Sequence, residues 1–181
     1  SAASDVYKRQ IQTNKNSQRV EGVSGRCIVM VTPDAERTMH TYLGVSDSIS
    51  IAEMDFEAAS NCEYMYLEGY LVTSDTARSA IIEMKDFAKS NGIKTAMTFS
   101  DPSMLQYFSD NVNEVLSDGV DLLFCNLQEA QLWSGEVDLD KAVEALKAIA
   151  KQFAVTTGAD GSLLWDGDQL MNIAPHRVPA V

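Results

Sequence analysis

Residues 120–129 read Val-Asp-Leu-Leu-Phe-Cys-Asn-Leu-Gln-Glu, and this stretch decides the fold class. Residues 120–125 form a compact apolar run that predicts a buried strand, and a helix is expected to begin near Leu127. Similar strands and helices alternate along most of the chain. This alternation with apolar strands predicts an α/β fold in three layers, a parallel sheet sandwiched by helices on both faces. Ligands bind such sheets at the carboxyl ends of the strands.

The flanking sequence follows the same alternation. Either Ser74 or Asp75 can cap a long helix, whose apolar positions recur at i, i+3 and i+4 and which ends before Gly92. Asp138 can cap a further helix, whose apolar face extends to Ala150. The expected strands are 63–69, 93–99, 120–125, 153–157, 162–165 and 169–173, and the other expected helices are 52–60, about 103–117 and one from Leu127.

Two short, partly polar strands precede the α/β region. Residues 27–32 and 37–43 are separated by a Pro-Asp-Ala-Glu turn, which predicts a hairpin suited to a lid. Residues 1–10 follow neither periodicity and resemble translated adapter sequence, so they are excluded from fold reasoning. We therefore expect residues 1–10 to be non-native, 11–50 to hold the lid strands and their connection, and 51–181 to form an α/β core that is incomplete at its C-terminus.

Composition excludes several classes of protein. The 181 residues carry a net charge of −12, which argues against a binder of duplex nucleic acid, although local backbone amides can still hold a phosphate. No apolar run reaches the ~18 residues of a membrane span and no signal peptide is visible, so we expect a cytoplasmic protein without a membrane partner. The three cysteines are far apart, which indicates reduced core thiols rather than a disulfide framework or a zinc site.

The loop after the 153–157 strand is the first candidate site. Residues 155–161 read Val-Thr-Thr-Gly-Ala-Asp-Gly. Thr156 followed by Gly158 and Gly161 can form a tight turn that directs backbone N–H groups at an anion. A plain turn between two strands explains the same residues equally well.

Asn126 and Glu129, which follow the 120–125 strand, are the second candidate site. Asn with Glu three residues later matches a capping box, which would make both residues structural. Alternatively, both side chains face the cleft and organise Mg²⁺ through water. The spacing by itself favours the cap.

Two further residues have both a chemical and a structural interpretation. Arg37, at the start of the second lid strand, could donate its planar fork to a phosphate, but it also suits a solvated turn. Asp101 follows the 93–99 strand and could contact a substrate or a cation, but Asp-Pro is also a common helix start. No P-loop, G-x-G-x-x-G, G-x-S-x-G or H-E-x-x-H motif occurs in the sequence.

In this order, the segments resemble the ribokinase-like (PfkB-type) family of carbohydrate and nucleoside kinases, over roughly residues 20–181. The match is carried by the lid hairpin GRCIVMVTPDAERTMHTYLG, the strand EYMYLEGY, the strand-loop TFSDPSML, the NLQE motif and VTTGADGSLLWDG. The stretch TPDAERTMHTYLG is closest to the adenosine-kinase-like branch. The resemblance implies transfer of the γ-phosphoryl group to a sugar or nucleoside hydroxymethyl group, with ATP and Mg²⁺ as cofactors.

The resemblance also implies roles for single residues. Thr156, Gly158 and Gly161 would hold the ATP phosphates and shape the nucleotide site. Asn126 and Glu129 would position the phosphates and Mg²⁺, with Glu129 acting through water. Arg37, on the lid, would reach the transferred phosphate, and the lid strands would close over the sugar.

Two parts of the family pattern are missing from this sequence. The G-A-G-D signature, which supplies the catalytic Asp and the anion hole, is absent, so the base is expected after Val181. The Gly-Gly-Asn substrate segment is absent as well. We therefore expect no catalytic base in this chain, which is predicted to be inactive by itself.

Two alternatives stay open from the residues. The chain could be a non-catalytic α/β module that binds a nucleotide or a sugar, or a plain interaction domain in which Asn126 and Glu129 only cap a helix. On the kinase interpretation, the partner is a small sugar or nucleoside, and the chain is a monomer or a homodimer formed through the lid. The residues that would choose among adenosine, ribose and fructose lie in the missing N-terminal pattern.

Overall fold

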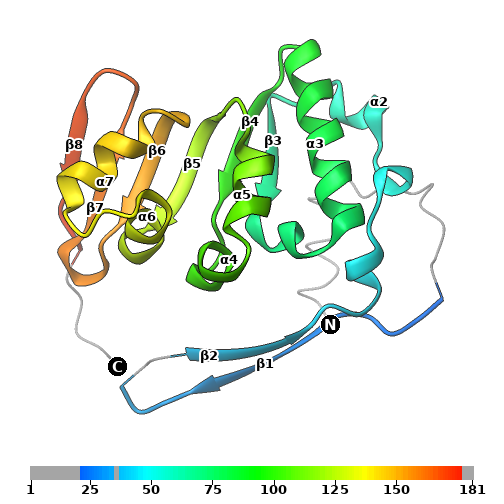
Figure 1. Ribbon diagram of the computed structural model, residues 1–181, viewed down its shortest axis with the longest axis horizontal. Helices are drawn as coiled ribbons and strands as arrows, with labels where there is room; N and C mark the ends of the chain where they lie inside the picture. Colours follow the sequence, from blue (N-terminus) through cyan, green and yellow to red (C-terminus); the bar gives the residue numbers. More distant parts are fainter. Residues whose placement is uncertain (1–20, 35–36, 177–181) are drawn as a thin grey trace.

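The computed structural model describes residues 21–34 and 37–176, so the expectation for residues 1–10 lies outside the described residues. A six-stranded sheet with helices packed against it forms the main body, and a separate two-stranded hairpin lies beside it (Figure 1). The strands are β1 (Arg26–Val31), β2 (Arg37–Tyr42), β3 (Tyr64–Glu68), β4 (Lys94–Thr98), β5 (Val120–Asn126), β6 (Ala150–Thr156), β7 (Ser162–Trp165) and β8 (Leu170–Ile173). The α-helices are α2 (Phe56–Ala59), α3 (Asp75–Ser90), α4 (Pro102–Tyr107), α5 (Ser109–Leu116), α6 (Leu127–Ser134) and α7 (Leu139–Leu146). The 3-10 helices are η1 (Gly44–Ser48), η2 (Ile51–Glu53), η3 (Gly69–Thr73) and η4 (Gly158–Asp160).

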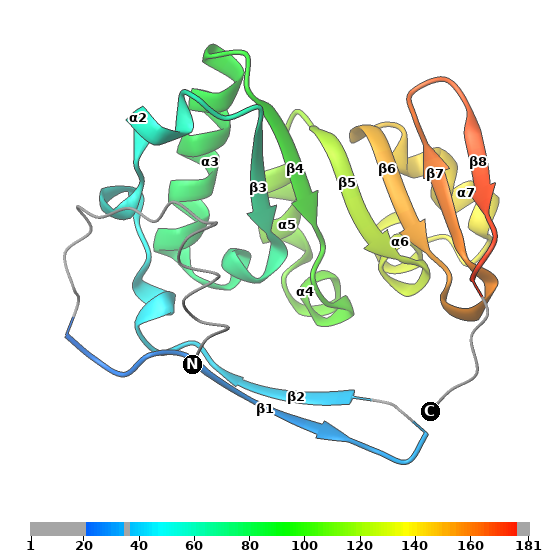
Figure 2. The ribbon, with the colours of Figure 1, turned by 180° about the vertical axis from the view of Figure 1, so that it is seen from behind.

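The strands of the sheet follow the order β3-β4-β5-β6-β7-β8. The first four strands pair in parallel, and β7 and β8 complete the sheet antiparallel. Because each parallel strand adds on the same side of the one before it, right-handed crossovers place the intervening helices on one face. The helices lie in front of the sheet in Figure 1 and behind it in Figure 2. The predicted α/β class with its mainly parallel sheet is confirmed.

The opposite face of the sheet carries partly exposed apolar side chains. Tyr66 on β3 is 53% exposed and Phe124 on β5 is 38% exposed. Their neighbours in sequence, Leu67 and Leu123, are buried on the helical face, as the two-residue period of a strand requires. Within residues 21–34 and 37–176, helices therefore cover one face of the sheet, and the second helical layer expected from the apolar strands is not among them.

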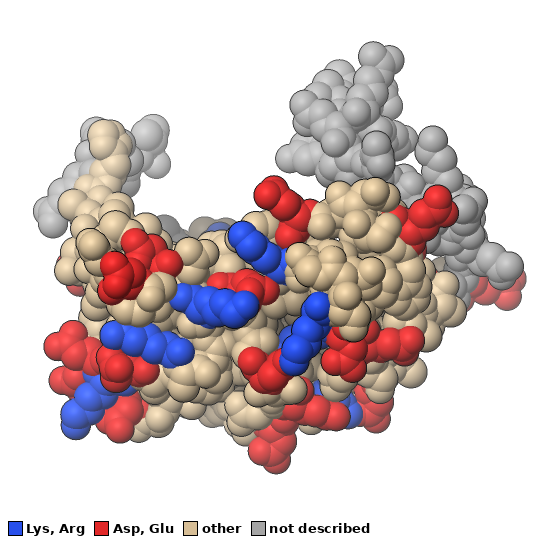
Figure 3. Space-filling view, turned by 90° about the horizontal axis from the view of Figure 1, so that it is seen from above, with Lys and Arg blue, Asp and Glu red and all other residues tan. Residues whose placement is uncertain are grey.

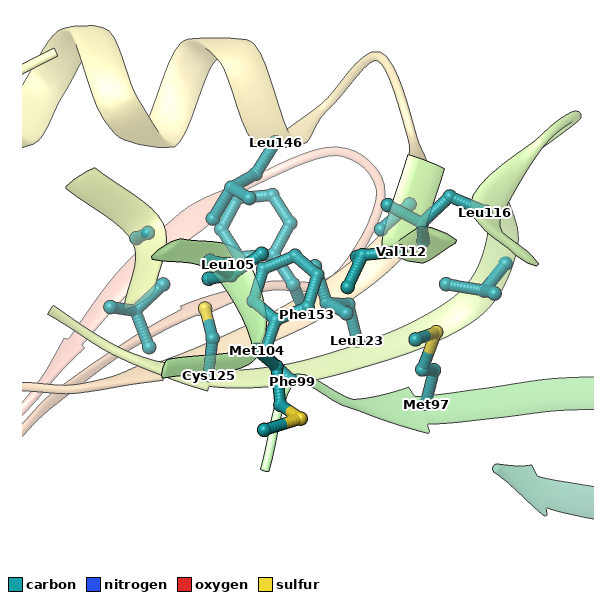
Figure 4. Packing of buried hydrophobic residues seen from close by; sticks show 14 of the residues in the cluster. Met97, Phe99, Met104, Leu105, Val112, Leu116, Leu123, Cys125, Leu146 and Phe153 are labelled. Carbon is teal, nitrogen blue, oxygen red and sulfur yellow. The ribbon is translucent and has the colours of Figure 1, made fainter. Parts of the chain in front are cut away.

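The hydrophobic core fills the space between the sheet and its helices (Figure 4). Phe99, Leu123 and Phe153 enter it from the strand side and are at most 1% exposed. Val112 of α5 and Leu146 of α7 meet them from the helix side and are fully buried. Burying a side chain of this kind contributes about 1.5–3 kcal/mol. This packing keeps the ends of the parallel strands in fixed positions relative to one another.

Three element boundaries differ from those expected. The expected helix 52–60 is divided into η2 and α2, because the side chain of Asp55 caps α2. The expected helix 103–117 is divided into α4 and α5, which meet at Phe108. β6 begins at Ala150, which the helical periodicity places inside a helix, because α7 ends one turn earlier.

The hairpin predicted for the proposed lid is present, and every residue of β1 and β2 is exposed. It lies on the side of the molecule where the parallel strands end (Figures 1 and 2). Cys125 is buried, whereas Cys27 and Cys62 are exposed, so the expectation of core thiols holds for Cys125 only. In the part of the chain that the structure describes, no helix has both the length and the apolar character of a membrane span.

Candidate functional site

The four parallel strands end at one edge of the sheet, on the side of the lid hairpin (Figure 2). Their last residues are Glu68, Thr98, Asn126 and Thr156, and we refer to these residues and the loops that follow them as the carboxyl edge. Asn126 and Thr156 are direct register partners between β5 and β6. The structure therefore brings together the two candidate sites that the sequence places 30 residues apart.

Asn126 ends β5 and caps α6. Its Oδ1 accepts a hydrogen bond from the N–H of Glu129 at 2.8 Å, and Oε2 of Glu129 accepts one from the N–H of Asn126 at 2.9 Å. This is the complete capping box that the spacing predicts. Among the described residues, the Nδ2 of Asn126 and the Oε1 of Glu129 make no further hydrogen bond. The cap thus fixes both side chains and leaves one polar atom of each for a ligand.

Glu129 is a buried carboxylate, with only 4% of its surface exposed. Burial raises its pKa, the N–H of Asn126 lowers it, and the nearby charge of Asp101 raises it again. Among residues 21–34 and 37–176, no lysine or arginine forms an ion pair with Glu129. A buried carboxylate without a protein cation beside it suits a hydrated divalent ion.

The loop after β6 turns back at once into β7. Gly158 and Gly161 have φ angles of +63° and +99°, in the region that favours glycine. A Cβ on Gly161 would lie 2.1 Å from a backbone carbonyl oxygen of β8, so this position has no room for a side chain. A Cβ on Gly158 would meet nothing within 4 Å, so this side of the loop is open. The loop is therefore a strand-to-strand turn, as one interpretation held, and its Thr156 and Gly158 are accessible at the carboxyl edge.

Asp101 and its neighbours form the part of the carboxyl edge after β4. Asp101 caps α4 by accepting from the N–H of Ser103 at 2.8 Å, which is its structural interpretation. Ser100 has a φ of +71°, a strained conformation for a residue with a Cβ, of the kind that concentrates at functional sites. Its hydroxyl donates to Glu68 at 3.3 Å, and its carbonyl accepts from the hydroxyl of Tyr70 at 3.4 Å.

Tyr70 lies near the carboxylates of the carboxyl edge, and their charges affect the pKa of its phenol. Burial raises the pKa of its phenol, and the charges of Asp101, Glu129 and Glu68 raise it further. Sequence reasoning missed Glu68, Ser100 and Tyr70, because the pairing of β3 with β4 brings them to the site. The one available signal was the Glu-Gly-Tyr that closes the strand EYMYLEGY.

The donor set at the carboxyl edge fits an ion held through water. Its carboxylates are those of Glu68, Asp101 and Glu129, and carboxylate oxygens are hard ligands that Mg²⁺ prefers. In the described residues, no group of three or more His, Cys, Asp and Glu side chains is close enough to bind a metal directly. Mg²⁺ at this edge would therefore complete its coordination with water and phosphate oxygens.

Arg37 is carried by a different element from the other candidates. It begins β2 at the free end of the hairpin, opposite Val31, and is exposed. The hairpin lies on the same side of the molecule as the carboxyl edge (Figures 1 and 2). Asn126, Glu129, Thr156 and the glycine loop thus share one edge, and Arg37 is on a separate arm facing that side.

Comparison with known proteins connects this geometry to a family. Residues 2–181 match the family model described as pfkB family carbohydrate kinase. An adenosine kinase from Schizophyllum commune is 28% identical over 136 residues, which cover 73% of this chain and 38% of that protein. The structure of adenosine kinase from Sinorhizobium meliloti has a TM-score of 0.81 at 32% identity, over 87% of this chain and 48% of that one. A probable sugar kinase from Rhizobium etli CFN 42 has a TM-score of 0.80 at 28% identity, over 85% of this chain and 47% of that one.

These matches have two consequences. The chain spans less than half the length of each of the three relatives, from 38% to 48%. The similarity extends over the lid hairpin, the sheet and the loops of the carboxyl edge, and it confirms both the ribokinase-like fold and the resemblance drawn from the sequence motifs. The chain belongs to the pfkB family of carbohydrate kinases.

Proposed function

We propose that the chain contributes the Mg·ATP site to the ATP-dependent phosphorylation of a hydroxymethyl group on a sugar or a nucleoside. Family membership and the similarity to an adenosine kinase and a probable sugar kinase support the reaction class. The observation that carries the proposal is the convergence of Asn126, Glu129 and Thr156 at one edge, beside a glycine turn. The proposed location is the cytoplasm, which supplies ATP and keeps exposed thiols reduced.

Each residue of this set has a distinct proposed role. The hydroxyl of Thr156 and the N–H groups of the loop at Gly158 and Gly161 donate to the phosphates of ATP. The Nδ2 of Asn126 donates to a phosphate oxygen, and the carboxylate of Glu129 orients the water shell of Mg²⁺. Bound Mg·ATP supplies the γ-phosphoryl group. Because the capping box holds Asn126 and Glu129 before the ligand arrives, little reorganisation is needed when charge develops.

The lid hairpin completes the proposed site. The guanidinium N–H groups of Arg37 donate hydrogen bonds to the transferred phosphate when the hairpin closes. Closure also excludes water from the reacting groups. The strands of the hairpin expose apolar residues on both faces, including Ile28 and Val31 at 66% and 65% and Met39 at 51%. An isolated two-stranded ribbon with so much exposed apolar surface favours pairing with a second copy. We propose a homodimer formed through the lid.

The catalytic base is the part of the reaction that these residues do not supply. The family resemblance assigns the base to a G-A-G-D segment, and the 181 residues contain none. We therefore propose that this polypeptide binds Mg·ATP without turning over a sugar or a nucleoside. Substrate-dependent release of ADP by the purified chain in a coupled assay would overturn this part of the proposal.

The complete capping box also fits an alternative in which Asn126 and Glu129 only cap a helix and bind no ligand. Glu129→Gln separates the two roles, since Gln at this position still accepts from the backbone N–H but carries no charge. We expect the Kd for Mg·ATP, measured by calorimetry, to rise at least about tenfold, or ~1.4 kcal/mol. Binding of ATP without Mg²⁺ should change little.

Glu53→Gln is the matched control. Glu53 accepts from the N–H of Ser50 at 2.8 Å in another capping box among the described residues, at η2. This variant loses the same charge from the same kind of cap and should bind Mg·ATP with unchanged affinity. If Glu129→Gln also leaves the affinity unchanged, the pair belongs to the helix cap and the chain is better described as an interaction or binding module.

A further inference from the structure

The amino ends of β4, β5 and β6 line an open cavity of about 610 Å³, at the opposite edge of the sheet from the candidate site. Five of the six lysines in residues 21–34 and 37–176 line this one cavity. They come from α3, β4, β6 and the segment between α7 and β6. The five are Lys85, Lys89, Lys94, Lys147 and Lys151. Figure 3 looks onto this edge and shows blue side chains gathered there with red ones between them.

The charge at this cavity is opposite in sign to that of the chain. The lining holds five lysines and three aspartates, which gives +2, whereas the whole chain carries −12. An acidic surface repels anions, so a basic cavity in it concentrates them locally. Lysine ammonium groups are flexible point charges that can adapt to the several oxygens of a phosphate group. The volume is within the range of small-molecule sites, about 300–1,000 Å³.

Two of the lysines are fixed in the lining by the end of α5. Lys85 is buried and donates from Nζ to the carbonyls of Val115 and Leu116 at 2.5 and 2.9 Å. Lys89 pairs with Asp118, whose carboxylate is also 3.7 Å from the Nζ of Lys85. These contacts neutralise Asp118 and anchor this side of the cavity.

The other three lysines have positions from which they can reach an anion. Lys151 is 80% exposed and pairs with Asp121 at 2.6 Å. Lys94 lies 5.3 Å from the ring centre of Tyr64 and forms no ion pair within the described residues. Lys147 lies 4.3 Å from the ring centre of Trp165, and its carboxylate partner does not line the cavity. Turning Lys94 and Lys147 toward a ligand therefore breaks no ion pair across the cavity.

We propose that this lysine cavity binds a small anion bearing one or more phosphate groups, as a second site distinct from the carboxyl edge. The strands between the two edges have five to seven residues, and at roughly 3.3 Å per residue they separate the edges by about 16–23 Å. A single small phosphate compound cannot span that distance. Occupation of the cavity therefore adds a ligand to the protein and does not extend the nucleotide site.

Trp165 provides a spectroscopic readout of the cavity. The chain has two tryptophans, so Trp133→Phe leaves Trp165 as the only one, with Lys147 over its ring. We expect the titration of this variant with inorganic tripolyphosphate to change the Trp165 emission in a saturable way. The Kd should increase as KCl is raised from 50 to 300 mM, because the attraction is electrostatic. Parallel titrations with inorganic phosphate and with ribose 5-phosphate show whether the free ion or a phosphorylated sugar binds more tightly.

Lysine variants decide where the anion binds. Lys94→Gln combined with Lys151→Gln keeps the Lys147–Trp165 reporter and should raise the Kd for tripolyphosphate at least tenfold. Lys141→Gln removes the one described lysine outside the cavity and should leave the Kd within about twofold. Both are surface changes, and circular dichroism melting checks the fold. Absence of saturable binding, equal losses in the two variants, or a loss caused by Glu129→Gln instead would each overturn the proposal.

Discussion

Asn126→Ala tests whether the cap and the ligand contact are carried by the same side chain. The substitution removes the Oδ1 that accepts from the N–H of Glu129 at 2.8 Å and keeps the backbone N–H that holds Oε2 of Glu129. Loss of an Asn cap costs about 1 kcal/mol. For a chain of this size, that corresponds to a fall in Tm of about 2–4 °C. The phosphate contact proposed for Nδ2 is lost at the same time, so the Kd for Mg·ATP should rise about tenfold.

Asp138→Ala is the matched control for this variant. Asp138 caps α7 by accepting from the N–H of Lys141 at 3.1 Å, and α7 has the same length as α6, eight residues. Thermal unfolding by circular dichroism should show similar losses for the two variants, and calorimetry should show weaker Mg·ATP binding for Asn126→Ala only. Equal Mg·ATP affinity of the two variants, whether both are unchanged or both are weakened, would rule out the phosphate contact proposed for Nδ2 of Asn126.

Substitutions of Glu129, Phe153 and Ile28 test the buried carboxylate, the core and the proposed dimer, respectively. Burial raises the pKa of Glu129 in the folded state, so the folded protein loses stability as the pH rises and this carboxyl group ionises. Glu129→Gln should therefore be more stable than the parent in urea unfolding at pH 8. This advantage should disappear below pH ~4, where the carboxyl group is protonated in both the folded and the unfolded state. Phe153 is 1% exposed, and Phe153→Ala should reduce the free energy of unfolding in urea by about 3–5 kcal/mol, whereas a loss below about 1 kcal/mol would contradict the described core. Ile28 is 66% exposed on the lid, and Ile28→Lys should convert the proposed homodimer to a monomer in light scattering while the circular dichroism spectrum of the folded chain is retained. A parent chain that is already monomeric at micromolar concentration would rule out that assembly.

The fold was predictable where local chemistry and periodicity agree. Ser74 and Asp138 cap the helices assigned to them, and the 120–125 strand and the helix after it lie where the apolar run and the Asn cap indicate. The start of β6 was not predictable, because Ala150 continues the apolar spacing of α7 beyond the residue at which that helix ends. One-sided coverage of the sheet depends on strand order, which spacing along the chain does not encode.

Some residues of the candidate site could be predicted from the sequence and others could not. Asn126 and Glu129 could be found because their spacing is a helix-start signal as well as a site signal. Glu68 and Ser100 could not be found from the sequence, because they meet only through the pairing of β3 with β4. The positive φ of Ser100 could not be predicted either, because serine rarely adopts such a conformation. The lysine cavity was hidden as well, since it gathers residues from four separate segments.

A paramagnetic ion can locate Mg·ATP at the carboxyl edge, where we propose that it binds. Mn²⁺ accepts the oxygen ligands that suit Mg²⁺, and as a paramagnetic ion it broadens the NMR signals of nearby amides. With ATP and substoichiometric Mn²⁺ added to the ¹⁵N-labelled chain, we predict the strongest broadening at Asn126, Glu129 and Gly158. The amides of Gly92 and Gly119, which line the lysine cavity at the opposite edge, should be broadened much less, even where ATP also occupies that cavity. Broadening centred on those two glycines, or no localised broadening at all, would contradict binding of Mg·ATP at the carboxyl edge.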